Sequence, residues 1–180
     1  MAPGLNALIG LLTALYPAAV YFGLQYLQPR LIALALAVML LLRLALIRAD
    51  WSKPLLLAGL AYAGFAIWSN QAVALRFYPA LVNAVMLAIF GASLLHPPSI
   101  VERLARLKQP DLPAQGVSYT RRVTQVWCGF FIINGGIAAA TALWSSFQFW
   151  SLYNGLIAYL LMGLLFAGEY WVRLRTLKPE

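Results

Sequence analysis

Six long apolar stretches run through this chain and are separated by shorter segments that carry nearly all of its charge. Of the 180 residues, 63% are hydrophobic and only 10% are charged, whereas about a quarter of an ordinary soluble domain is charged. A soluble fold of this size could not bury so much apolar surface, but a bilayer requires only that backbone polar groups be hydrogen-bonded within each helix. The sequence therefore predicts an all-α, polytopic membrane protein with a single transmembrane domain.

The six stretches predict six transmembrane helices. Their approximate bounds are 5–27, 31–47, 54–68, 77–95, 123–144 and 151–172. Most of them reach the roughly 20 residues that a hydrocarbon layer about 30 Å thick requires. The third is shorter, and its length alone is equally compatible with a re-entrant segment. The start of the chain lacks the basic region of a cleaved signal, so the first stretch is expected to be a retained helix.

The distribution of basic residues favours six crossings. Lys and Arg number 13 against 5 Asp and Glu, which gives a net charge of +8. With six spans and a cytoplasmic N-terminus, every basic residue except Arg30 and Arg76 falls on the cytoplasmic side, as the positive-inside rule requires. Without the third span, the basic cluster after the fourth stretch would lie opposite the first basic loop. We therefore expect a protein of the inner (cytoplasmic) membrane with both termini in the cytoplasm.

The longest polar segment follows the fourth predicted span, and we expect it to begin with a short interfacial helix. Ser99 and Glu102 form a capping-box pattern directly after two prolines. Over 99–108 the apolar residues share one face that cations flank, and Glu102 is placed to pair with Arg106 four residues later. Such an amphipathic helix is typical of the membrane surface. A proline-broken loop is expected at 109–116.

Polar side chains within the predicted spans form the first set of candidate site residues, because such groups are costly in hydrocarbon and are often functional. They are Arg43, Asn83, Asn134, Asn154 and Glu169. For the asparagines, the simpler explanation is an interhelical hydrogen bond worth on the order of 1 kcal/mol. For Glu169 it is an ion pair with Arg173, four residues later. Arg43 either reaches the cytoplasmic surface with its long side chain or pairs with Glu169 across the bundle.

Five cations between the fourth and fifth predicted spans form a second candidate site. They are Arg103, Arg106, Lys108, Arg121 and Arg122. Anionic lipid head groups are the simplest partners of this basic surface, at about 1 kcal/mol per residue. A cytoplasmic synthesis enzyme or an acyl carrier protein is the alternative. Nucleic acid is not expected, because the basic residues are not interleaved with aromatic ones.

No recognised catalytic, cofactor or metal-binding motif is present, so the sequence leans against an enzyme and predicts no cofactor. Cys128 is the only cysteine and His96 the only histidine, which rules out an intramolecular disulfide or a cysteine-based metal site. Catalysis would fall to His96 with Asp111 or Glu169 orienting it, but no nucleophile elbow or phosphate-binding loop accompanies it. Cys128 is expected to be a small apolar filler.

Four runs in the second half of the chain carry a family resemblance. They are 97–106, 110–113, 119–131 and 153–169, so that about 75–175 is covered. They resemble a family of uncharacterised bacterial inner-membrane proteins that are typically encoded with genes for aryl polyene (xanthomonadin-type) pigment lipids. More distantly, the order of helices, Pro17 and the group around Trp127 are similar to the intracellular septation protein A family. The resemblance implies a place in the bacterial inner membrane and in cell-envelope chemistry.

These patterns favour a non-catalytic accessory or scaffold protein in aryl polyene lipid biosynthesis or cell-envelope maintenance. It would dock synthesis enzymes or acyl carrier protein at the bilayer through its basic surface. The alternative is a transporter or flippase for a lipid-linked product, whose path the intramembrane polar residues would line. A membrane-bound enzyme is a third and weaker reading. Substrate and oligomeric state stay open at this level.

Overall fold

The computed structural model describes residues 16–23, 26–46 and 53–176, and these are helical with no strand among them. The elements are α2 (Tyr16–Gly23), α3 (Pro29–Leu46), α4 (Lys53–Ser69), α5 (Ala72–Arg76), α6 (Tyr78–Leu95), α7 (Ile100–Arg106), α8 (Ala114–Trp144), α9 (Phe147–Leu152), the π-helix η2 (Tyr153–Ile157) and α10 (Ala158–Thr176). The all-α prediction is confirmed for this part of the chain. Much of the first predicted span, 5–27, lies outside the described residues.

Three helical segments are long and apolar enough to cross a membrane: Tyr78–Leu95, Ala114–Trp144 and Phe147–Arg175. Shorter apolar stretches, Pro29–Leu42 and Leu56–Ser69, lie in α3 and α4. Many large apolar side chains on these helices are exposed, among them those of Leu164 and Ile133. Exposed apolar surface of this extent is costly in water and suits contact with hydrocarbon.

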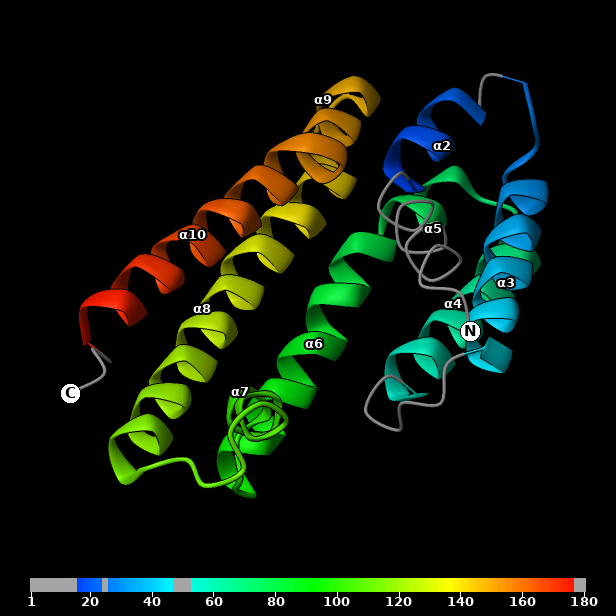
Figure 1. Ribbon diagram of the computed structural model, residues 1–180. Coiled ribbons are helices and arrows are strands. Elements are labelled where there is room, and N and C mark those ends of the chain that lie inside the picture. The colour runs from blue at the N-terminus through cyan, green and yellow to red at the C-terminus, as the bar shows by residue number, and fades with distance from the viewer. Residues whose placement is uncertain (1–15, 24–25, 47–52, 177–180) are drawn as a thin grey trace.

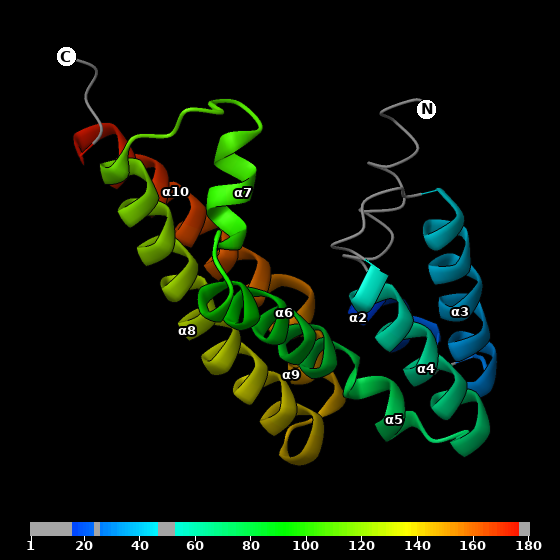
Figure 2. The same ribbon diagram turned by 90° about the horizontal axis from the view of Figure 1, so that it is seen from below.

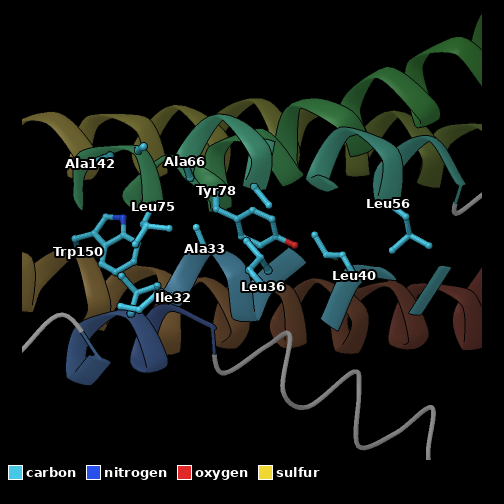
Figure 3. Close-up of a cluster of buried hydrophobic side chains, with 13 residues drawn as sticks. Ile32, Ala33, Leu36, Leu40, Leu56, Ala66, Leu75, Tyr78, Ala142 and Trp150 are labelled. Atoms are coloured by element: carbon cyan, nitrogen blue, oxygen red, sulfur yellow. The ribbon is translucent and has the colours of Figure 1, made fainter. Parts of the chain in front are cut away.

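The helices form two groups that meet at α5 and α6. Figure 1 shows α6, α8 and α10 side by side, with α3 and α4 paired on the other side of α6. A cluster of buried apolar side chains joins the groups, with Leu36 and Leu40 from α3, Leu75 from α5 and Trp150 from α9 (Figure 3). Because this cluster packs α3 and α4 against the starts of α6 and α9, it holds the two groups together.

Successive long helices run in opposite directions. Each end of the molecule therefore brings together the start of one helix and the end of another. Near one end, the Tyr119 hydroxyl of α8 bonds to Glu169 of α10 at 3.2 Å. At the other end, Trp150 Nε1 of α9 donates to the backbone oxygen of Arg76 at 2.9 Å. The end that holds α7, the start of α8 and the end of α10 is called here the α7 end, and the opposite one the α5 end.

Helix α7 matches the predicted short helix over 99–108. The Ser99 hydroxyl accepts the backbone N–H of Glu102 at 3.4 Å, and Arg106 Nη2 lies 2.8 Å from Glu102 Oε1. Figure 1 shows α7 end-on beside long helices that are seen from the side, and Figure 2 shows it lengthwise. The helix therefore runs across the long helices at their α7 end.

Two segments predicted as connections are partly helical. The loop predicted over 109–116 is wrong from Ala114 onward, because α8 begins there directly after Pro113. Pro113 is the N-cap of α8 and has an extended backbone, and the N–H that proline lacks would have no partner within the helix. The uncharged connection after α8 contains α9, which the Ser146 hydroxyl caps by accepting the N–H of Phe149 at 3.2 Å. Such a cap satisfies a backbone donor that the first turn leaves free.

Candidate functional site

A cavity of about 800 Å³ lies between α6, α7, α8 and the helix formed by η2 and α10. Sites for small molecules in proteins have volumes of roughly 300–1,000 Å³. Helix α8 lines the cavity from Gly116 to Asn134, and η2 with α10 lines it from Asn154 to Arg173. At a rise of 1.5 Å per residue, both stretches correspond to a length of about 27 Å. The cavity is therefore a long channel that follows the helix axes.

Aromatic side chains form the middle of the channel wall. Trp127 and Phe131 of α8 face Phe166 of α10 and Phe90 of α6. The ring centroids of Trp127 and Phe166 are 4.6 Å apart, and those of Phe90 and Phe131 are 5.1 Å apart. Edge-to-face and tilted contacts at these distances are favourable. They connect the three long helices through side chains and leave an apolar surface toward the channel.

Three asparagines line the channel near its α5 end. Asn134 Nδ2 donates to Asn83 Oδ1 at 3.1 Å, which joins α8 to α6. The Tyr153 hydroxyl donates to Asn134 Oδ1 at 2.9 Å, and Asn154 Nδ2 donates to Thr141 Oγ1 at 3.2 Å. These amides are buried, and all three predicted asparagines line the channel. The interhelical hydrogen bond expected for such residues is present between Asn83 and Asn134.

The close approach of α6 and α8 at this point depends on Gly135. A Cβ atom on Gly135 would lie 2.9 Å from the Cβ of Asn83. Contacts this short are repulsive, so only glycine lets the two backbones come near enough for the Asn83–Asn134 hydrogen bond. Gly136, the next residue, has nothing within 4 Å of such an atom.

Sequence reasoning missed Tyr153 and the π-helix in which it stands. Over Tyr153–Ile157 the helix widens, and Tyr153 and Asn154 are both buried although they are adjacent in sequence. An α-helix turns by about 100° per residue and buries neighbours less readily, whereas π-helical turns often occur at functional sites. No residue pattern in 153–157 predicts this turn, from which the Tyr153 hydroxyl reaches Asn134 of α8.

Glu169 lies near the α7 end of the channel. Its Oε1 is 3.2 Å from the Tyr119 hydroxyl and 3.8 Å from Arg173 Nε, and Tyr119 OH is also 3.1 Å from its backbone oxygen. The ion pair predicted between Glu169 and Arg173 is present. Arg43 belongs to α3, but its side chain lies outside the described part of the structure, as does any contact of it with Glu169. Tyr119 was not among the predicted residues.

The predicted basic surface divides into separate groups. Arg103 Nε donates to the backbone oxygen of Pro98 at 2.9 Å. Arg106 pairs with Glu102 and donates to the backbone oxygen of Pro110 at 2.9 Å. Both side chains therefore hold the turns on either side of α7. Lys108 lines the channel, and Arg121 and Arg122 are exposed on α8.

His96 is exposed where α6 ends, and its Nδ1 lies 3.3 Å from the backbone oxygen of Ala92. It therefore acts as a helix-end residue. Cys128 is partly buried on α8. Within the described ranges, no group of three or more His, Cys, Asp or Glu side chains could hold a metal ion.

At the α5 end, Arg76 closes the last turn of α8. Its Nη2 donates to the backbone oxygens of Thr141 at 2.7 Å and Ser145 at 2.9 Å. The guanidinium lies 5.7 Å from the ring centre of Phe147 and 6.0 Å from that of Trp150. Burial lowers the pKa of Arg76 from its ordinary value. A cation at a helix C-terminus satisfies free carbonyls and the helix dipole, which explains one of the two basic residues away from the α7 end.

Comparison of the chain with protein-family models, curated proteins and solved structures finds no match.

Proposed function

We propose that this protein binds a lipid-like, amphipathic molecule in the channel between α6, α7, α8 and α10, and that it moves or presents this molecule at the membrane. One observation carries the proposal. Of the five intramembrane polar candidates, the four with described side chains (Asn83, Asn134, Asn154 and Glu169) line a single cavity. Its remaining wall is largely apolar, which is typical of sites with a few placed polar groups.

This arrangement supports a transporter or flippase, or an accessory protein that presents a lipid-linked molecule, over a scaffold that acts through its basic surface alone. A scaffold needs no internal channel. Two of the five predicted docking cations hold the turns around α7, and Lys108 belongs to the channel. The function we propose therefore lies inside the helix bundle.

The proposed placement has six spans, both termini in the cytoplasm and the α7 end at the cytoplasmic surface of the bacterial inner membrane. Arg103, Lys108, Arg121 and Arg173 all belong to the α7 end, and cytoplasmic segments are rich in Lys and Arg. Helix α7 runs across the long helices, as an interfacial helix would. At about 46 Å, the 31 residues of α8 exceed the hydrocarbon layer. Its first turns then extend into the head groups.

The resemblance over about 75–175 assigns this activity, as a proposal, to aryl polyene lipid biosynthesis or cell-envelope maintenance. A lipid-linked product of such a pathway has the shape that the channel requires, because it joins a long apolar part to a polar group. The same proposal needs no catalytic residue and no cofactor.

The test is ligand retention by the full chain purified from its membrane in mild detergent. Ala158 and Met162 line the channel on α10, so Ala158→Phe or Met162→Trp should fill it. Ala167→Phe is the matched control, because Ala167 is exposed on the same helix and does not line the channel. Native mass spectrometry should find a co-purified lipid-like molecule on the unchanged protein and the control. Equal retention by both filled variants would refute the proposal.

A second function, docking of a cytoplasmic synthesis enzyme or acyl carrier protein, is favoured by the exposed pair Arg121 and Arg122. Acidic proteins are attracted to such cations mainly through long-range electrostatics. Arg121→Glu combined with Arg122→Glu should abolish co-purification of these partners at low salt while membrane insertion persists. Unchanged co-purification would end this alternative.

A further inference from the structure

We infer that the channel takes a single-chain amphiphile with one negatively charged head group, which Lys108 and Arg173 hold at the α7 end. This inference rests on the proposed function and adds the chemical class of the ligand. Three observations carry it: the charges at the α7 end, the shape of the channel, and the hydrogen bonds that already satisfy its far end.

Two cations line the channel at the α7 end, and one of them has no anionic partner among the described residues. Glu169 is matched by Arg173 at 3.8 Å and by the Tyr119 hydroxyl at 3.2 Å. Glu102, on α7, is matched by Arg106 at 2.8 Å. Lys108 lines the channel, and in the described part of the chain no carboxylate lies within ion-pair distance of it. Lys108 and Arg173 against Glu169 therefore give this end of the channel a net positive charge, which favours an anion.

The shape of the channel suits an extended chain. Its volume of about 800 Å³ extends over a length of about 27 Å along the helix axes. One extended chain fits this shape, and phosphatidate, with its two chains, tests whether a second chain also enters.

The far end of the channel accepts an apolar tail. The amides of Asn83 and Asn134 bond to each other, to the backbone oxygen of Pro79 and to the Tyr153 hydroxyl. Buried polar groups that are satisfied in this way lose little when hydrocarbon covers them. The head group therefore lies at the cationic end, and the tail passes the aromatic rings of Trp127 and Phe166.

The test measures binding of defined probes to the full chain in neutral nanodiscs. The probes are palmitate, its alcohol and its amine, which share one chain and differ in head-group charge. Lysophosphatidate supplies a phosphate head on one chain, and phosphatidate supplies two chains. Palmitate or lysophosphatidate should bind more tightly than the alcohol by about fivefold or more, which corresponds to one ion pair at the membrane surface. Whichever of these two probes binds more tightly identifies the preferred head group as a carboxylate or a phosphate.

Variants assign the preference to Lys108. Lys108→Gln should lower the affinity for the anionic probe about fivefold and leave the affinity for the alcohol unchanged, whereas Lys108→Arg should retain both. Arg175→Gln is the control, because Arg175 is a cation near the end of α10 that does not line the channel. Equal binding of alcohol, amine and palmitate, or tighter binding of phosphatidate, would overturn this inference while sparing the proposed function. Failure of every probe to bind would overturn both.

Discussion

Trp150 and Arg76 are in direct contact at the α5 end of the molecule. The indole Nε1 of Trp150 donates to the backbone oxygen of Arg76 at 2.9 Å, while the guanidinium of Arg76 reaches the last carbonyls of α8 and lies over the Trp150 ring. Trp150 is completely buried. One pair of residues, 74 positions apart in the chain, thus ties the end of α5 to α8 and α9 and fixes where the channel helices begin.

Arg76→Gln should destabilise the protein, because hydrogen bonds from a charged donor are worth about 1.5–3 kcal/mol and two carbonyls would lose theirs. Arg76→Lys should recover only part of this loss, since an ammonium lacks the planar face that lies over the rings of Phe147 and Trp150. The measurement is thermal unfolding of the purified full chain in detergent. Arg30→Gln is the control, because Arg30 is exposed and contributes its backbone N–H, not its side chain, to the bond with Asn70. Equal melting temperatures for Arg76→Gln and the unchanged protein would contradict the role assigned to this side chain.

Gly135→Ala should separate α6 from α8, because the added Cβ would lie 2.9 Å from the Cβ of Asn83. Overpacking of this kind costs about 1–3 kcal/mol. Gly136→Ala has open space around it, and replacing a helical glycine with alanine adds about 0.5–1 kcal/mol of stability. The two neighbouring substitutions should therefore shift the melting temperature in opposite directions. A shift of the same sign and size for both would show that the helices do not approach closely at Gly135.

The Asn83–Asn134 hydrogen bond should appear as a coupling energy between the two positions. In a double-mutant cycle with alanine, we expect about 0.6–1.7 kcal/mol, the range for interhelical hydrogen bonds in membranes. The cycle uses unfolding in detergent with each single variant and the double variant. Pairing Asn83 with Thr124, which is buried on α8 and bonds to its own helix at Thr120, gives a control cycle that should be additive. Strictly additive changes in the free energy of unfolding at Asn83 and Asn134 would mean that this hydrogen bond contributes nothing to stability.

The proposed topology predicts where added cysteines react in intact cells. Starting from Cys128→Ser, a cysteine at Ser146, in the turn between α8 and α9, should react with a membrane-impermeant reagent from the periplasmic side. A cysteine at Arg121 should react only after the membrane is opened, because the α7 end is placed in the cytoplasm. Tags at both termini should likewise stay protected. Labelling of the Arg121 position from outside would mean that the α7 end faces the periplasm. That result would contradict the proposed cytoplasmic head-group site.

Local patterns in the sequence were sufficient for most of the helices. Hydropathy placed α3, α4 and α6 within about two residues of their observed bounds, and the Ser99 capping pattern placed α7. Each of these signals acts over a few neighbouring residues, because helical hydrogen bonds, caps and i,i+4 pairs are local. The same reasoning found the ion pairs of Glu102 with Arg106 and of Glu169 with Arg173, and it selected the polar residues that line the channel.

Local patterns failed where a neighbouring helix decides the outcome. The early start of α8 and the π-helix at Tyr153 have no sufficient signal in their own segments. The division of the basic cluster follows from carbonyls that only the folded turns around α7 present to Arg103 and Arg106.

The amino-acid sequence by itself determined that this protein consists of apolar helices, with most charged residues in the segments between them. Solvent preference and helix formation depend on composition and near neighbours. The tertiary structure alone decided that Asn83, Asn134, Asn154 and Glu169 share one channel, that Tyr119 meets Glu169 and that Arg76 caps α8. The last two contacts join residues 50 or more positions apart. Their formation depends on how the helices pack, since contact between distant segments requires close packing of many side chains at once.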